Sequence, residues 1–225
     1  MKVAVVRFPG SNCDQDAFHA VRDQVGVDAD YVWHGDTSLS GFDAVFLPGG
    51  FSYGDYLRCG AMAARAPIMT EVIRFAQEGR PVIGACNGFQ VLCETGLLPG
   101  ALLRNETELF VCREVYLRRV NTTSVWTAGV DRDLAIPIAH GEGRYICDDE
   151  TLRRLQGENL IAFRYVKGDD GVNHNPNGSV DDIAGLVNEA GNVLGLMPHP
   201  ERACHPRLGS ADGLEILKAL TLLRA

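Results

Sequence analysis

The chain places a cysteine between two glycines, at a point where an apolar run gives way to a helical pattern. Cys86 lies in GACNGFQ, with Gly84 two residues before it and Gly88 two residues after it. A nucleophile elbow holds its reactive side chain on a sharp strand-to-helix turn that leaves room only for small residues at those two positions. A helix beginning at Asn87 would direct backbone N–H groups at the sulfur and favour the thiolate. The same motif also suits a small buried cysteine, so by itself it leaves both interpretations open.

A thiolate nucleophile needs an imidazole partner, and His199 has the most suitable surroundings among the six histidines. It follows the apolar run 193–197 and should emerge at the end of a strand. Glu201 comes two residues later, so in an extended segment both side chains leave the backbone on the same side and the carboxylate could hold the ring. For an isolated HPE tripeptide, a Pro-rich surface turn with a solvated glutamate is the alternative.

A metal site is a further interpretation of the same segment. It would recruit His199, Glu201, Cys204 and His205. Their spacing matches none of the familiar zinc patterns, so we predict no metal site.

Attack on a carbonyl carbon also requires donors for the oxyanion that forms. The turn at residues 48–51, PGGF, ends a predicted strand, and the amide of Gly50 there is unhindered. The N–H of Asn87 can supply a second donor. A plain turn would explain the glycines equally well.

The apolar pattern alternates between strands and helices in the first part of the chain. Strands are predicted at residues 3–6, 31–33, 44–47 and 82–85, and helices at residues 14–25, 69–76 and 87–95. This alternation implies a mostly parallel sheet with helices on both faces, whose loops at the carboxyl ends of the strands form the ligand crevice. Gly49, Gly50 and Cys86 all fall at that edge.

Longer extended segments follow. Residues 109–120 and 160–166 are predicted as strands, and residues 183–187 and 193–197 as a hairpin across residues 188–192. A final amphipathic helix is predicted from four leucines: Leu214, Leu217, Leu220 and Leu223. Because the sequence has no clear linker or internal repeat, we expect residues 1–225 to form one α/β domain.

The composition limits the partners. A formal net charge of -8 without a run of Lys or Arg argues against a nucleic-acid or anionic-membrane surface. The seven cysteines form no CxxC pair and follow no secretory signal, which indicates a reducing cytoplasm. The apolar run in the opening MKVAVVRFPG is too short for a signal peptide or a membrane span and is predicted as a strand. We therefore expect a cytoplasmic protein that binds neither nucleic acid nor membrane.

Three ordered features together resemble the triad glutamine amidotransferases: an upstream PGG turn, a cysteine in GxCxGxQ and a downstream HPE. The resemblance implies a flavodoxin-like fold with Cys86 as nucleophile, His199 as general base and acid, and Glu201 as the carboxylate that orients the ring. It also implies that Gly50 and Asn87 supply the oxyanion donors.

Longer segments are similar to the family of glutaminase subunits of phosphoribosylformylglycinamidine synthase, an enzyme of purine biosynthesis. These segments are RFPGSNCDQD (7–16), PGGFSYGDYLRCGAMA (48–63), CNGFQ (86–90), IAHGEGRY (138–145) and MPHPERA (197–203), and the similarity extends over essentially the whole chain. In that family the subunit releases ammonia from L-glutamine, and a separate ATP-dependent synthetase subunit installs it on formylglycinamide ribonucleotide, in many lineages with a small third subunit. The resemblance implies no cofactor in this chain, with ATP and Mg²⁺ on the synthetase.

The resemblance also implies a glutamine pocket. Its residues would be Gly49, Phe51, Gln90, His140, Gly141 and Glu142. Gln90 lies one helical turn beyond Cys86 and so on the same face, whereas the residues alone describe His140 only as a histidine in a Gly-rich loop. Arg144 and Cys59 depart from the family pattern, where Asn and a small hydroxyl or alanine are expected, and Arg144 leaves the shape of its loop open.

Two other functional classes remain open. A stand-alone cysteine hydrolase or peptidase would share the elbow and the histidine, but it would not explain Gln90 or the stretch at residues 51–58. A non-catalytic binding module on this fold usually lacks one triad residue, and all three are present. Glutamate release would separate these classes.

Overall fold

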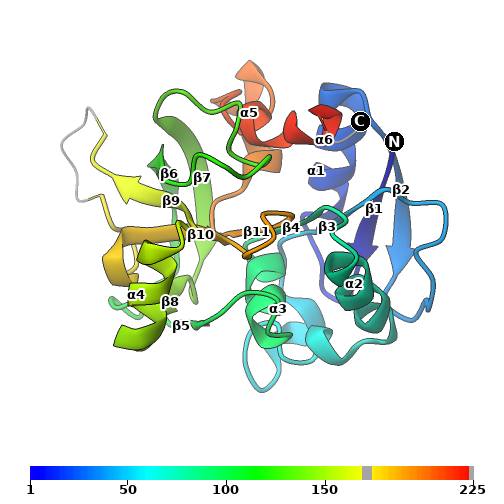
Figure 1. Ribbon diagram of the computed structural model, residues 1–225, viewed down its shortest axis with the longest axis horizontal. Helices are drawn as coiled ribbons and strands as arrows, with labels where there is room; N and C mark the ends of the chain where they lie inside the picture. Colours follow the sequence, from blue (N-terminus) through cyan, green and yellow to red (C-terminus); the bar gives the residue numbers. More distant parts are fainter. Residues whose placement is uncertain (169–173, 223–225) are drawn as a thin grey trace.

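A central sheet organises the chain. The computed structural model describes residues 1–168 and 174–222, and within them nine strands form one sheet in the order β2-β1-β3-β4-β11-β10-β9-β6-β7 (Figure 1). In that order their bounds are Asp28–Trp33, Lys2–Arg7, Ala44–Leu47, Val82–Ala85, Val193–Leu196, Ile183–Val187, Ile161–Val166, Val111–Arg119 and Leu134–His140. Neighbours from β2 to β11 run parallel, and those from β11 to β7 run antiparallel. Seven of the nine described strands therefore point in one direction, and β10 and β6 in the other.

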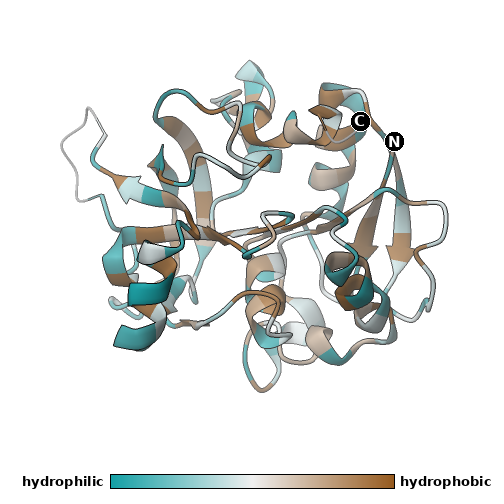
Figure 2. Ribbon diagram, in the orientation of Figure 1, coloured by the Kyte–Doolittle hydropathy of each residue, from teal (hydrophilic) through white to brown (hydrophobic). Residues whose placement is uncertain are grey.

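Helices cover both faces of this sheet. On one side lie α1 (Asp14–His19), α5 (Gly213–Leu217) and α6 (Ala219–Leu222), and on the other α2 (Pro67–Gln77), α3 (Asn87–Glu94) and α4 (Asp149–Gly157) (Figure 1). Alternate residues of β1 enter two separate cores, Val3 and Val5 with α1 and α5, and Ala4 and Val6 with α2 and α3. Figure 2 shows apolar residues along the central strands and polar residues on the outer surface of α4. The predicted α/β fold class is confirmed.

The central strands are short and fully buried. β3 (AVFL), β4 (VIGA) and β11 (VLGL) have every residue buried, as expected for parallel strands covered on both faces. Leu47 pairs with Gly84, and Ala85 pairs with Leu196, so the three strands end close together at one edge of the sheet. The loops that follow them carry the residues with predicted chemistry.

Several elements differ from the predictions. The helix predicted at residues 14–25 is α1 followed by a π-helical turn, Ala20–Val25, and the final helix is divided into α5 and α6, with Leu223 outside the described residues. Among the described α-helices and strands, four were not predicted: β7, α4 and the small antiparallel pair β5 (Ala101–Leu103) and β8 (Arg144–Ile146). β7 contains Pro137, and it lies at the edge of the sheet, where a strand tolerates proline. Among the described residues, no helix has the length and apolar character needed to cross a membrane.

Candidate active site

Cys86 occupies the predicted turn between β4 and α3. Its backbone has φ +49° and ψ -106°, a conformation that L side chains rarely adopt, so the turn is strained. The N–H of Cys86 donates to the carbonyl of Leu196 at 2.8 Å, which anchors the turn on β11. A Cβ on Gly88 would lie 2.0 Å from the carbonyl oxygen of Leu47, and one on Gly84 would lie 2.6 Å from the backbone of Gly88. Only glycine fits at both positions, as in a nucleophile elbow.

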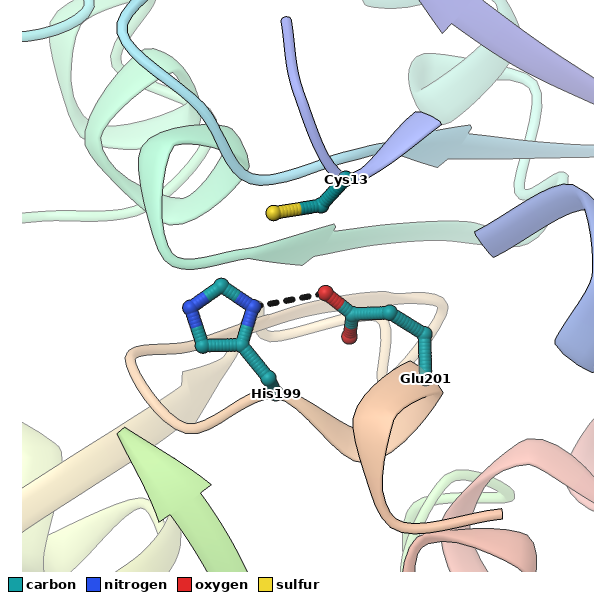
Figure 3. A group of neighbouring side chains, drawn as sticks. All are labelled: Cys13, His199 and Glu201. Carbon is teal, nitrogen blue, oxygen red and sulfur yellow. Dashed lines mark hydrogen bonds and ion pairs between the residues drawn. The ribbon is translucent and has the colours of Figure 1, made fainter. Parts of the chain in front are cut away.

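His199 and Glu201 form a buried pair just after β11. Nδ1 of His199 lies 2.6 Å from Oε1 of Glu201, and each residue is 1% exposed (Figure 3). The pair is made across a turn of 3-10 helix, Pro200–Arg202, so the predicted extended segment is wrong although the two side chains meet. Their burial excludes a surface turn with a solvated glutamate.

The surroundings of His199 favour its imidazolium form. Burial disfavours the charge, but the carboxylate of Glu201 and the sulfur of Cys86 outweigh it, and the pKa of His199 is raised well above its ordinary value. Because Nδ1 faces Glu201, Nε2 is the nitrogen left for the thiol, and in the described part of the chain this buried atom has no hydrogen-bond partner. Cys86 and His199 line one cavity of about 110 Å³. The structure thus brings Cys86, His199 and Glu201 into one site.

Cys13, which was not predicted as a site residue, lies beside the same imidazole. The sulfur of Cys13, a ring nitrogen of His199 and a carboxylate oxygen of Glu201 all lie within 4.8 Å of one another (Figure 3). Sγ of Cys13 donates to Oδ1 of Asn12 at 3.1 Å, and burial raises the pKa of this thiol. A protonated thiol is a weak nucleophile. Cys86, on its elbow at the N-terminus of α3, is the better candidate.

The atoms of Cys13, His199 and Glu201 that lie together are also of the types that ligate metals. Two ligands of one tetrahedral zinc lie roughly 3.3 Å apart, given metal–ligand distances of about 2.0 Å, whereas Nδ1 of His199 and Oε1 of Glu201 are 2.6 Å apart. That separation is a hydrogen bond and not a pair of ligands. The metal set weighed from the sequence does not assemble, because Cys204 Sγ donates to the carbonyl of Glu201 and His205 accepts from the N–H of Arg207.

The proposed oxyanion donors flank the thiol. Gly50 has φ +149°, lines the cavity with Cys86, and has no room for a side chain, since a Cβ would lie 2.8 Å from Cα of Ser11. The N–H of Asn87 is in the first turn of α3, where a helix offers no acceptor of its own. Gly49 lies elsewhere, against the imidazole, because its Cβ would approach Cε1 of His199 to 2.7 Å. Its absent side chain makes room for that ring.

The remaining predicted pocket residues gather around a second cavity that adjoins Cys86. Phe51, Gln90, His140, Gly141 and Glu142 line a second cavity of about 20 Å³, which also touches Cys86 and Gly50. Gln90 connects two parts of the cavity wall. Its Nε2 donates to the carbonyl of Glu142 at 2.6 Å, and its Oε1 accepts from Nδ2 of Asn87 at 2.8 Å. A cavity of 20 Å³ holds about one water, so an amino acid needs it to widen.

Asn105 positions His140, although no sequence signal marked it. Its Oδ1 lies 3.1 Å from Nδ1 of His140 and accepts from the N–H of Gly143, while its Nδ2 donates to the carbonyls of His140 and Leu109. Burial lowers the pKa of His140 to about 4. Arg144, whose role was open, begins β8 and donates from Nε to the carbonyl of Gly178 at 3.2 Å.

Comparisons with known proteins identify the family. A family model of the CobB/CobQ-like glutamine amidotransferase domain matches residues 1–211. A chain in the structure of PurLQS from Thermotoga maritima is 43% identical with a TM-score of 0.87, and the alignment covers 99% of both chains. A protein of Thermoplasma acidophilum assigned to GMP synthase has a TM-score of 0.64 at 14% identity, over 99% of this chain and 93% of that one. A glutamine amidotransferase from Thermotoga maritima has a TM-score of 0.62 at 14% identity, over 100% of this chain and 99% of that one. The last two show the fold alone, whereas the family match covers most of the sequence: the chain belongs to the CobB/CobQ-like glutamine amidotransferases.

Proposed function

We propose that this chain is the glutaminase subunit of phosphoribosylformylglycinamidine synthase, and that it hydrolyses L-glutamine through Cys86, His199 and Glu201. The observation that carries this proposal is the buried arrangement in which the elbow cysteine and the Glu201-bound imidazole share one cavity. Identity of 43% over 99% of a chain in PurLQS supports the assignment to this synthase.

In the first half-reaction, the thiolate of Cys86 attacks the side-chain carbonyl carbon of glutamine. The N–H groups of Gly50 and Asn87 stabilise the oxyanion. The imidazolium of His199 then gives its Nε2 proton to the departing nitrogen, the C–N bond breaks, and ammonia leaves a glutamyl thioester on Cys86. The raised pKa of His199 suits this step, because the proton is present at neutral pH.

In the second half-reaction, neutral His199 takes a proton from water, and the resulting hydroxide attacks the thioester carbonyl. The C–S bond breaks and the thiolate–imidazolium pair is restored. The product leaves with a γ-carboxylic acid, which loses its proton to water to give glutamate. Glu201 fixes the tautomer and stabilises the positive ring throughout.

Ammonia would be protonated in bulk water, so we place its acceptor on a bound partner. That partner is an ATP-dependent synthetase subunit that converts formylglycinamide ribonucleotide to formylglycinamidine ribonucleotide, with a small third subunit in the assembly. ATP and Mg²⁺ belong to the synthetase, and this chain uses no cofactor of its own. We place the complex in the cytoplasm.

Matched cysteine variants test the proposal. In the complex, Cys86→Ser should abolish glutamate release and glutamine-dependent synthesis, while synthesis from added ammonia continues, because a hydroxyl is far less ionised than a thiolate. The control is Cys112→Ser, since Cys112 is exposed on β6. Equal loss with both nitrogen sources would show that Cys86 is structural.

A further inference from the structure

Cys13 is a buried thiol for which the proposed mechanism has no use. Its sulfur lies within 4.8 Å of a ring nitrogen of His199 and of a carboxylate oxygen of Glu201 (Figure 3). Cys13 also lines the cavity of about 110 Å³ together with Cys86. The imidazole of His199 interacts with both of these thiols, and both cysteines are free. Two thiols therefore share one base in one cavity.

Cys86 is the thiol of this pair that should react first with an oxidant. A thiolate beside an imidazolium is the form of cysteine that attacks a hydroperoxide, and in the proposed mechanism Cys86 and His199 form that pair. The cavity of about 110 Å³ has room for hydrogen peroxide, because one water occupies about 30 Å³ in the liquid. Burial raises the pKa of Cys13, so that thiol stays protonated at rest. The two cysteines therefore start in different states.

An oxidised Cys86 would have Cys13 as its neighbour in the cavity. A cysteine sulfenic acid condenses with a nearby thiol to a disulfide, which prevents further and irreversible oxidation. Resting on the proposed function, we propose that Cys13 is the resolving thiol of a peroxide-sensitive switch, which forms a disulfide with Cys86 and reversibly stops glutamine hydrolysis. In a reducing compartment such a disulfide is transient and follows the supply of oxidant.

His199 can serve both steps of this switch. In the first step, the thiolate of Cys86 attacks one oxygen of hydrogen peroxide. An S–O bond forms, the O–O bond breaks, and the leaving hydroxide takes a proton from the imidazolium of His199 to give water. The sulfur loses two electrons to the peroxide and becomes a sulfenic acid.

In the second step, neutral His199 takes the proton of Cys13, and the new thiolate attacks the sulfur of Cys86. An S–S bond forms and the S–O bond breaks. The leaving hydroxide takes the proton that His199 has just accepted, and a second water is released. A dithiol then restores both cysteines by thiol–disulfide exchange.

Cys59 is the competing partner for Cys86, because it lines the adjoining cavity of about 20 Å³. Its side chain interacts with Asp55 and Glu142, and burial together with these two carboxylates raises the pKa of the Cys59 thiol. The negative charges oppose the thiolate that a resolving cysteine must form. Cys13 lies beside a base, whereas Cys59 lies beside two acids, so Cys13 is the favoured partner.

Disulfide formation requires a movement, because the two sulfurs must approach to about 2.05 Å. The elbow is held on β11, where the N–H of Cys86 donates to the carbonyl of Leu196 at 2.8 Å. The N–H of Cys13 donates to the carbonyl of Gly49 at 3.2 Å, which is the long end of the normal range. The loop that carries Cys13 is therefore the part that we expect to move.

The test follows the cross-link and the activity of one treated sample. The full chain is exposed to hydrogen peroxide, and catalase then removes the excess. One portion is alkylated and digested with trypsin, and mass spectrometry should find residues 8–22 joined to residues 75–104, with fragmentation placing the bond between Cys13 and Cys86. The other portion is mixed with the synthetase and assayed for glutamate release. Release should fall roughly tenfold or more, and dithiothreitol should return it to within about twofold of the untreated value.

Matched variants identify the partner of Cys86. With Cys13→Ser, peroxide should carry Cys86 on to its sulfinic acid, and dithiothreitol should recover less than about a tenth of the untreated activity. Cys59→Ser removes the competing thiol and should behave like the unsubstituted chain. Each variant is compared with its own untreated activity, so any effect of the substitution on turnover cancels.

A cross-link from Cys86 to Cys59, or full recovery of Cys13→Ser in dithiothreitol, would overturn the switch. The cross-link is measured on the unsubstituted chain, so this outcome does not depend on the folding of a variant. Glutamate release by the untreated complex without a cross-link between Cys13 and Cys86 after peroxide refutes only this inference. Absence of glutamate release from the untreated complex refutes the proposed function, and the inference with it.

Discussion

Replacing Glu201 by Gln isolates the charge of the buried pair while keeping an oxygen at the same place. His199 and Glu201 are each 1% exposed and 2.6 Å apart at their nearest atoms. With charge centres roughly 4 Å apart and an effective dielectric of about 20, the interaction is about 4 kcal/mol. If the transition state loses this stabilisation of the imidazolium, kcat/KM should fall roughly a thousandfold.

The pH profile gives the second readout of Glu201→Gln. The carboxylate raises the pKa of His199 against the opposing effect of burial, so its removal must lower that pKa. The imidazolium is present only below its pKa, and the alkaline limb of kcat/KM should therefore move to lower pH. Glutamate release by the complex, followed from neutral to alkaline pH, measures both effects.

Two further variants test the prediction for Glu201→Gln. Glu215→Gln removes a carboxylate that pairs with Lys218 on the surface and should leave the profile unchanged. His199→Ala should cost more than Glu201→Gln, because it removes the ring itself. If the two losses rank in the opposite order, or if the alkaline limb stays in place, Glu201 does not act by holding a proton on His199.

Two further predictions concern the elbow and the oxyanion turn. Gly88→Ala places a methyl group 2.0 Å from the carbonyl oxygen of Leu47 and should lower the free energy of unfolding by about 1–3 kcal/mol. Gly157→Ala, with open space around it, should be close to neutral. Equal Tm values for the two variants in thermal unfolding would contradict this packing argument. We expect the oxyanion donor at Gly50 to turn away from the site in the isolated chain and to turn back in the complex, and loss of one such donor costs roughly 10²–10³ in rate. The isolated chain should therefore release little glutamate, and complex formation should raise kcat far more than it lowers KM. Equal kcat for the isolated chain and the complex in steady-state kinetics would contradict gating by that donor.

The sequence predicts the parts of the site that depend on local geometry. Gly88 is required because the turn passes close to Leu47 of β3, and Gly84 because it passes close to Gly88 itself; both requirements are visible within five residues. The pairing of His199 with Glu201 is also local, although it is made by a 3-10 turn and not by an extended segment. Strands such as β3 and β4 are recognisable because burial on both faces makes their sequences continuously apolar.

Contacts between distant segments could not be predicted in this way. Cys13 reaches His199 because the loop after β1 packs beside the loops after β3 and β11, and spacing along the chain carries no trace of that. Asn105 fixes the tautomer of His140 from a loop with no motif. α4 escaped notice because the helix is mostly polar and only Leu155 in it is buried, so few apolar residues mark its inner face.

The position of β11 has a consequence for how the protein is made. This strand inserts between β4 and β10, and Val193 pairs with Val82 although about half of the chain separates them. The N–H of Cys86 is also anchored on Leu196 of this strand. A nascent chain that has emerged only as far as α4 therefore holds Cys86 without His199 and without the anchor for its turn. Pairing across such a long loop is slow, so we expect the site to be completed only after β11 has been made and has inserted between β4 and β10.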